Sequence, residues 1–318
     1  MFKKNIIFVF LQLFFLLGCN QGQNTVTNTK TLQGNEGLKM EIIAKNIPEN
    51  AYENEDLDMV IKLTNKGAYD IPAADSVLKI TLERGYLAFV GGDHLVTDSF
   101  ALVGKERFTR VDDIMLKEYR FITGVLDEQS KVHTSLILAS ACYNYLTKAY
   151  ADVCIDTDIY NIKPIDKVCS AKPVSLSGGQ GAPVAVTGVE PRMLANGDYI
   201  RPQFTITIKN VDEGSVIEYN KINTVCSSSS LTRDDYNTID LVELRFSDFT
   251  INDFTCEPTR DGRFVAKLKN EEDKIVCTLG ENLLPKSTVT YETPLYIELR
   301  YGYTLSKSTQ VTINKVPT

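Results

Sequence analysis

The stretch CYNYLTKAYADVCI, residues 142–155, aligns without a gap with RYGYTLSKSTQVTI, residues 300–313. Each stretch begins with two tyrosines separated by one residue and continues with alternating apolar residues. Alternation at a period of two is typical of strands that bury one face. We therefore interpret each stretch as a β-hairpin, with its turn at residues 147–149 in the first copy and 305–307 in the second.

A second match extends this repeat toward the beginning of each copy. DLDMVIKLTNKG (Asp56–Gly67) is similar to RPQFTITIKNVDEG (Arg201–Gly214), and aligning Asn65 with Asn210 superimposes three apolar residues at period two. In both copies a short strand pattern, a proline and an acidic turn come before this alternating strand. The sequence therefore predicts the same β-rich unit twice.

Short strand patterns recur about every ten residues in both copies, with Gly, Asp, Asn or Pro between them, and no long amphipathic helix is evident. This spacing predicts an all-β protein made of two tandem Ig-like antiparallel β-sandwiches with about seven strands each. We expect the first sandwich over residues 38–165 and the second over residues 184–318. Residues 166–183, which are rich in Pro, Gly and Ser, are expected to form the linker between them.

The N-terminal residues 1–19 read MFKKNIIFVFLQLFFLLGC, with a basic start, an apolar run and a small residue before a cysteine. This is the pattern of a secretory signal, and its end, Leu16–Cys19, resembles the lipobox of prokaryotic lipoproteins. The resemblance implies that Cys19 carries a diacylglycerol, so that the membrane is a partner through lipid. The alternatives are an uncleaved anchor and a plain secretory signal. Residues 20–37 are polar and contain Gly, which predicts a flexible tether.

The composition excludes some classes of partner. The 318 residues include 34 Lys and Arg against 41 Asp and Glu, a formal charge of -7, and removal of the signal with Lys3 and Lys4 brings it to -9. Basic residues form no run longer than two, which disfavours nucleic acid and anionic lipid as charge-driven partners. After the signal no segment approaches eighteen apolar residues in a row, so we expect the remainder outside the cytoplasm.

Six cysteines remain after Cys19, an even number that suggests disulfides in an exported chain. The hairpin interpretation places Cys142 opposite Cys154, and the second copy has no cysteine at either of the aligned positions. The last two bracket two short strand patterns around a charged turn, and the middle two are paired by elimination. The expected disulfides are Cys142–Cys154, Cys256–Cys277 and Cys169–Cys226. The alternative, a metal site, lacks any Cys-x-x-Cys spacing.

Residues 176–180 spell LSGGQ, the signature of nucleotide-binding subunits of transport ATPases. That segment needs a phosphate-cradling loop ending in Gly-Lys-Ser or Gly-Lys-Thr, and the chain has none. We therefore interpret its glycines as linker residues that supply flexibility and positive φ before the second sandwich begins at Val184.

No catalytic residue is predicted. His94 lies close in sequence to Asp98 and Ser99, but there is no Gly-x-Ser-x-Gly motif, and we interpret it as a loop histidine. With only His133 besides it, the chain also offers no histidine cluster for a metal, and no cofactor is expected.

Acidic clusters and paired tyrosines leave two alternatives open. Calcium prefers carboxylate clusters, yet solvated turn residues are the simpler interpretation without an EF-hand-like loop. The acidic clusters are Glu53–Asp58, Asp156–Asp158, and Asp234 with Asp235. The paired tyrosines are expected to pack a sheet face, and an exposed ladder for glycan stacking is the alternative. They are Tyr143, Tyr145, Tyr301 and Tyr303.

The strand, proline, acidic turn and alternating strand that begin each copy resemble the prokaryotic Ig-like, adhesion-related (CARDB-like) β-sandwich domains found in tandem on cell-surface proteins. The resemblance implies surface display, spacing or binding and carries no catalytic residue. We therefore expect a lipid-anchored, non-catalytic protein outside the cytoplasm with an adhesion, binding or envelope-structural role, its partner another protein or a surface glycan. An extracytoplasmic hydrolase or carbohydrate-active module, and an accessory subunit of an envelope complex, are the alternatives.

Overall fold

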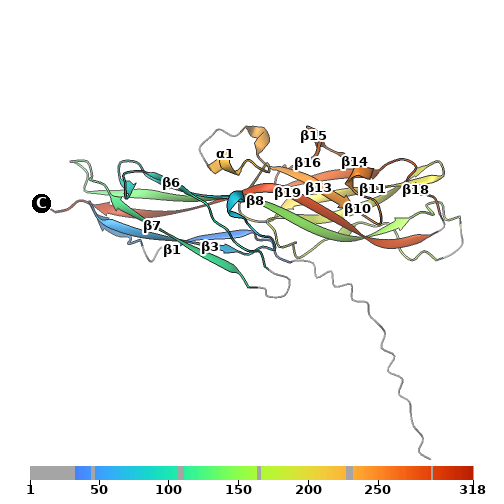
Figure 1. Cartoon of the computed structure of the whole chain (residues 1–318), viewed down its shortest axis with the longest axis horizontal. Helices are drawn as coiled ribbons and strands as arrows, with labels where there is room; N and C mark the ends of the chain where they lie inside the picture. Colours follow the sequence, from blue (N-terminus) through green and yellow to red (C-terminus); the bar gives the residue numbers. More distant parts are fainter. Residues whose placement is uncertain are drawn as a thin grey trace, which may run out of the picture. The chain divides into compact units, whose positions relative to one another are not determined.

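In the computed structural model of the protein, two long strands organise the fold (Figure 1). They are β8 (Val132–Asp156) and β19 (Thr290–Asn314). Every odd-numbered residue of β8 from Ser135 to Ile155 is buried, and β19 follows the same alternation. The strands pair antiparallel over their whole length, with Asn144 opposite Gly302. The repeated stretches of the sequence are therefore paired with each other.

The predicted hairpins are wrong. Residues 147–149 and 305–307, where the turns were expected, lie inside β8 and β19. The alternation continues through these positions without a change of phase, and none of them is Gly, Pro, Asn or Asp. The pairing of β8 with β19 also satisfies the backbone N–H and C=O groups that would have paired within each hairpin.

The structure describes residues 33–43, 47–105, 111–162, 166–226, 232–287 and 289–317. They belong to one compact unit, Thr31–Thr318. The predicted signal with Cys19, and the tether up to residue 32, lie outside the described residues. Strands hold 60% of the described residues and helices 5%, so the all-β prediction is confirmed. No helix in the described ranges is long and apolar enough to cross a membrane.

Each copy has a matching series of strands that ends in its long strand. The first copy contains β1 (Leu38–Ile43), β3 (Asp56–Asn65), β4 (Ser76–Leu82), β5 (Leu87–Phe89), β6 (Leu95–Asp98) and β7 (Asp113–Thr123) before β8. The second contains β10 (Val184–Asn196), β11 (Tyr199–Asn210), β13 (Thr238–Arg245), β14 (Phe254–Glu257), β16 (Arg263–Lys267) and β17 (Glu272–Leu279) before β19. The pairings match too: β3 lies between β1 and β7 as β11 lies between β10 and β17. The repeat is therefore structural.

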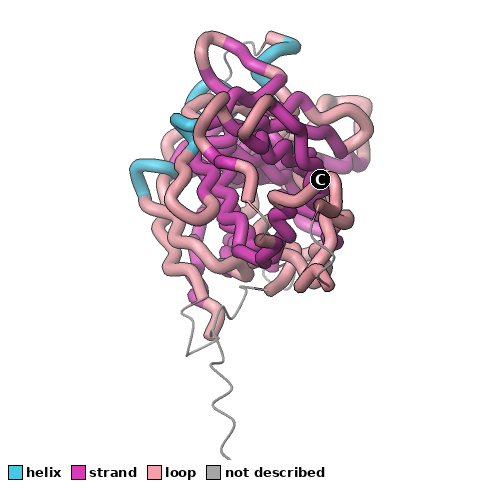
Figure 2. Tube along the Cα trace, turned by 90° about the vertical axis from the view of Figure 1, so that its right-hand side faces the viewer, coloured by secondary structure: helices cyan, strands magenta, loops and turns pink. Residues whose placement is uncertain are grey.

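The remaining elements are short, and the helical ones lie outside the strands (Figure 2). They are the strands β2 (Asn50–Tyr52), β9 (Val174–Ser175), β12 (Ser215–Ile217), β15 (Thr259–Arg260) and β18 (Leu284–Pro285), the helix α1 (Ile222–Cys226), and the 3-10 turns Ala73–Asp75, Arg233–Asp235 and Ile251–Asp253.

The described strands form three sheets. The first outer sheet, β1-β3-β7-β5, comes from the first copy, and the second outer sheet, β14-β17-β11-β10-β9, from the second. The third, which we call the shared sheet, runs β15-β16-β13-β19-β8-β4-β6 and draws on both copies. Across the layers β1 packs on β19 and β10 packs on β8, so each outer sheet covers the long strand of the other copy.

This sharing corrects the predicted domain division. Two sandwiches are present, but the shared sheet is continuous between residues 38–165 and 184–318. The end of the expected linker, residues 180–183, is buried: Gln180 is 5% exposed, and its side chain bonds both backbone groups of Val186. The glycines of the LSGGQ segment do have positive φ, as at Gly178 (86°).

The paired tyrosines fill the centre of the core, which excludes the glycan ladder. Tyr143, Tyr145, Tyr301 and Tyr303 are between 0% and 3% exposed. Their hydroxyls bond equivalent groups in the two copies. The Leu38 N–H donates to the Tyr143 hydroxyl (3.0 Å), and the Val184 N–H to the Tyr301 hydroxyl (3.4 Å).

The aligned asparagines make the second set of equivalent bonds. The Tyr145 hydroxyl donates to Asn65 Oδ1 (3.5 Å) and the Tyr303 hydroxyl to Asn210 Oδ1 (3.0 Å). Each asparagine amide in turn bonds the carbonyl four residues later. The two copies are therefore related by a pseudo-twofold axis, which the Asn144–Gly302 pair marks.

The described cysteines form three disulfides, and two of the expected pairings are wrong. The structure joins Cys142–Cys226, Cys154–Cys169 and Cys256–Cys277, of which the last is the pair expected from the sequence. Cys142 and Cys154 cannot meet because β8 is one extended strand: twelve residues at about 3.3 Å each separate them by about 40 Å. The pairing of Cys169 with Cys226, inferred by elimination, fails with it.

Candidate functional site

A hollow of about 260 Å³ lies at the pseudo-twofold axis, and we call it the central hollow. It is lined by Asp70, Pro72, Asp75, Asn144, Tyr145, Leu146, Tyr219 and Arg300. The first six come from the first copy and the last two from the second. The site therefore exists only where the copies meet.

The hollow marks a break in the symmetry of the repeat. In the second copy β12 (Ser215–Ile217) pairs with β19 beside Gly302, where an added Cβ would lie 2.7 Å from Ile217. In the first copy the corresponding segment is Asp70–Pro72, which follows Asn65 as β12 follows Asn210. It bridges Leu102 instead of β8. The space that β12 fills on one side of the axis is therefore open on the other.

Two carboxylates and an amide form one wall of the central hollow. Asp70 Oδ1 accepts the Gly104 N–H (2.7 Å), and Asp75 Oδ1 accepts the Asn144 side-chain N–H (2.9 Å). No hydrogen bond within the described ranges engages the second oxygen of either carboxylate. This wall can therefore accept hydrogen bonds from a ligand.

A cation and an aromatic ring form another part of the lining. The Arg300 guanidinium lies over the Tyr219 ring, 5.2 Å from its centroid, and 3.9 Å from a Glu298 oxygen. Five N–H donors make arginine suited to carboxylate or hydroxyl groups of a ligand. The lining residues include no histidine, cysteine, serine or lysine. The groups that the central hollow presents to a ligand are two carboxylates, an amide, a guanidinium and tyrosine rings.

A disulfide holds the part of the second copy that reaches this hollow. Cys142–Cys226 links β8 to α1, with a Cα–Cα distance of 6.3 Å. The chain just before α1 carries Tyr219 and Asn220, and the Asn220 N–H donates to Asn144 Oδ1 (3.1 Å). The aromatic wall is therefore fixed against the first copy by one covalent and one polar contact.

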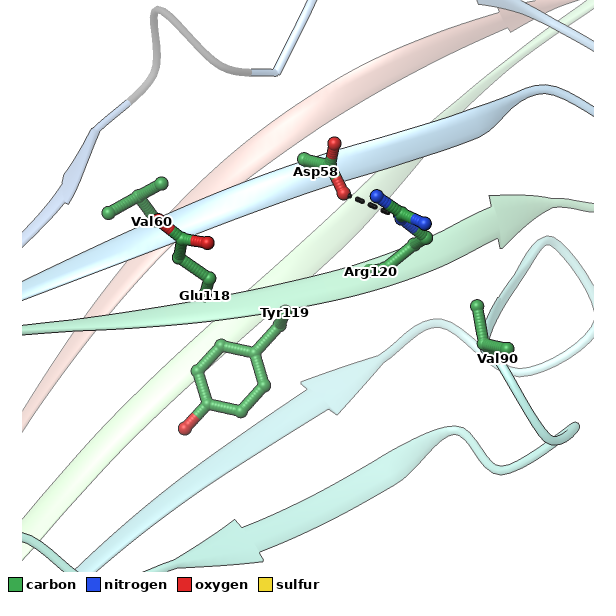
Figure 3. A pocket seen from close by; sticks show the side chains of 6 residues that line it. All are labelled: Asp58, Val60, Val90, Glu118, Tyr119 and Arg120. Carbon is green, nitrogen blue, oxygen red and sulfur yellow. Dashed lines mark hydrogen bonds and ion pairs between the residues drawn. The ribbon is translucent and has the colours of Figure 1, made fainter.

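A second, larger hollow of about 450 Å³ lies on the first outer sheet, and we call it the edge hollow (Figure 3). It is lined by Asp58, Val60, Val90, Glu118, Tyr119 and Arg120. Arg120 Nε donates to Asp58 Oδ1 (3.0 Å), but both side chains are more than 60% exposed, and such pairs contribute little stability. Burial raises the pKa of Tyr119, whose hydroxyl lies 3.4 Å from Asp98.

The structure does not assemble a triad around His94. The carboxylate of Asp98 accepts bonds from Lys117 Nζ (2.8 Å) and from the Ser99 N–H. The Lys117 bond, with smaller help from the Ser99 N–H, keeps the pKa of Asp98 below its usual value. Asp98 is thus committed to Lys117, which lies on β7 of the first outer sheet.

The acidic clusters are tied to backbone groups and lysines. Glu53 accepts the N–H groups of Leu126 and Val316, Asp156 accepts Lys167 Nζ (2.6 Å), and Asp235 accepts the Thr232 N–H. In the part of the chain that the structure describes, no group of three or more His, Cys, Asp or Glu residues could hold a metal ion. The carboxylates therefore act as turn and cap residues.

Of the residues that line the central hollow, only Tyr145 was singled out from the sequence, and the site was not predicted. Asn144 and Gly302 stand at equivalent positions of the repeat, and this difference at its centre is a signal that the sequence holds. Nothing in the sequence marks Tyr219 or Arg300, because their place depends on the pairing of β8 with β19 and on Cys142–Cys226.

No protein-family model and no curated protein matches the chain. Among solved structures it is similar to the C-terminal domain of the Streptococcus pyogenes antigen I/II-family protein AspA, at 8% identity and a TM-score of 0.19, covering 88% of this chain and 100% of that one. It is also similar to the structure named BspA_C_WT (8% identity, TM-score 0.20, 86% and 97% covered) and to a partial N-terminal region of an enterococcal surface protein (8%, 0.18, 85% and 83%). Likeness at this level does not bear on what the chain binds.

Proposed function

We propose that the protein is a non-catalytic binding protein displayed outside the cytoplasm, held to the membrane by lipid on Cys19. The sequence of residues 1–19 supports the export and the anchor. Disulfides among the described residues fit an oxidising compartment, since cytosolic thiols are normally kept reduced. Acyl chains would contribute about 0.8 kcal/mol per buried methylene, enough in a pair for stable attachment.

The central hollow is the observation that carries the binding role. It joins two carboxylates, an amide, a guanidinium and an aromatic ring, drawn from both copies and fixed by Cys142–Cys226. At about 260 Å³ it lies just below the range of roughly 300–1,000 Å³ typical of pockets for whole small molecules. It therefore suits one polar unit of a larger partner, either a terminal sugar of a surface glycan or one side chain of a protein.

Binding can be tested with glycan and peptide arrays probed with the purified protein, followed by titration of the best ligand. Arg300→Ala is expected to weaken binding at least tenfold. The matched control is Arg245→Ala, because Arg245 also lies over a tyrosine, Tyr296, at 4.7 Å but outside the hollow. Ligand binding that keeps its affinity in Arg300→Ala would contradict a role for the central hollow.

The anchor is tested separately. Labelling of growing cells with radioactive palmitate is expected to mark the wild-type chain and not Cys19→Ala, which should leave the membrane fraction. A Cys19→Ala chain that remains membrane-bound and exported would point to an uncleaved anchor instead.

A further inference from the structure

The N-terminal part of β7 is an open sheet edge. On its free side β7 pairs with β5 only over Phe121–Thr123, and the last bond is from the Val90 N–H to the Arg120 carbonyl (3.4 Å). Beyond it, Asp113–Arg120 pair with β3 alone. The edge hollow is the notch where this pairing stops, with Val90 and Tyr119 on its lining (Figure 3).

The direction of the free backbone groups follows from that last bond. Because the Arg120 carbonyl points away from β3, the N–H and C=O groups at Glu118, Leu116 and Ile114 point the same way, since residues two apart in a strand are oriented alike. No backbone partner for these three residues exists among the described residues. They present a template for one more strand.

The corresponding edge of the second copy is better protected. There β14 pairs with Val276–Leu279 of β17, and the disulfide Cys256–Cys277 fastens it. Among the described residues, Glu272 bridges Lys269, so only Asp273–Ile275 of β17 lack a backbone partner on that side, less than half of the open length in β7. The first copy thus leaves open an edge that the second largely closes.

The side chains along the β7 edge favour association. Ile114 is 53% exposed and Leu116 is 56% exposed, both on the outer face of the sheet. On the inner face, Asp113 lies two residues before Met115 and Lys117 lies two residues after it. Natural edge strands usually avoid exposed apolar residues because these promote pairing with another chain.

We propose that this edge pairs with the same edge of a second copy, which goes beyond the proposed binding role. In an antiparallel pair with its twofold axis at Met115, Ile114 faces Leu116 of the second copy, and Asp113 faces Lys117 of the second copy, each twice. Lys117 then lies between Asp98 of its own chain and that Asp113, so one cation serves two carboxylates. Shifting the axis to Leu116 places Ile114 opposite Glu118 and removes the ion pairs.

A proline tests the backbone pairing directly. The Leu116 N–H points away from β3, so Leu116→Pro removes no hydrogen bond among the described residues but blocks an added strand. The control is Lys274→Pro, which places proline on the corresponding open edge of β17. Sedimentation velocity of the full chain in detergent should show a monomer–dimer equilibrium that Leu116→Pro weakens at least tenfold and Lys274→Pro leaves unchanged.

A cysteine at the axis tests the register. Residues at the axis form a non-hydrogen-bonded pair with Cα atoms about 4.5 Å apart, within the range for a disulfide. Met115→Cys should therefore give a dimer on non-reducing gels, and Leu116→Cys should give much less. If thermal unfolding shows that Leu116→Pro is misfolded, Leu116→Lys replaces it. A chain that is monomeric at every concentration would overturn the proposal. A dimer that persists in both Leu116→Pro and Leu116→Lys would also overturn it.

Discussion

Replacing Gly37 by alanine tests the close packing on which the tyrosine core depends. A Cβ at this position would lie 2.5 Å from the Tyr143 hydroxyl and 3.0 Å from Pro183 Cδ. The Tyr143 ring is fully buried, so it cannot move aside, and overpacking of this kind costs about 1–3 kcal/mol. Tyr143→Phe alone leaves the buried Leu38 N–H without its acceptor, which costs about 1–3 kcal/mol.

The two changes should compensate each other. Phenylalanine removes the oxygen that the new methyl group meets, so the double variant should be about 1–2 kcal/mol more stable than the sum of the single changes predicts. Urea unfolding at constant pH with the disulfides intact measures all four chains. The control is Gly124→Ala, whose Cβ would meet the Gly85 carbonyl oxygen and not Tyr143. Its effect should therefore be additive with that of Tyr143→Phe. Additivity of the Gly37 pair within about 0.5 kcal/mol would refute the packing argument.

Three further predictions follow from the same architecture. Joint replacement of Cys142 and Cys226 by alanine opens a loop of 84 residues and should lower the free energy of unfolding by about 4–5 kcal/mol, measured by urea unfolding against the wild type. Arg263→Met should cost about 2 kcal/mol at pH 7, less than the 3–5 kcal/mol of a fully buried pair, because Arg263 is 39% exposed and Arg260 still pairs with Glu218, although Asp240 loses its ion pair with Arg263. Burial acts to raise the pKa of Glu218, but hydrogen bonds from arginines outweigh it and lower the pKa. The stability from this carboxylate is therefore present above its unfolded pKa of about 4.3 and lost below it, so the difference between variant and wild type should shrink on acidification. Either copy expressed alone should lack the cooperative thermal transition of the whole chain, because each is missing the long strand of the other, and circular dichroism will detect this.

Much of the fold could be predicted from the sequence because strand burial and the repeat both leave local patterns. The alignment of Asn65 with Asn210 and of the tyrosine pairs identified groups that the structure relates by a pseudo-twofold axis. These patterns depend only on which residues alternate, and alternation is set by the strand itself.

The long-range pairings could not be predicted in this way. An alternating run of fourteen residues fits one long strand or two short ones, and only the absence of turn residues at 147–149 and 305–307 argues for one. The choice of partner for β8 lies outside its own sequence. The disulfide prediction inherited that error, because Cys142 and Cys154 were placed opposite each other by a turn that does not exist.

The difference between the copies explains why the two candidate sites lie where they do. In a fully symmetric repeat, equivalent spaces are filled in the same way. Neither copy could then have a binding site that the other lacks. In the second copy β12 fills the space that, in the first copy, is the central hollow. In the second copy β14, with its disulfide, also covers most of the edge of β17, whereas in the first copy β5 leaves most of the edge of β7 free. The central hollow opens beside the long strands of the shared sheet, and the free edge of β7 belongs to the first outer sheet. Binding groups held by such a scaffold lose little conformational freedom when a partner arrives, which is the condition for useful affinity from a small contact.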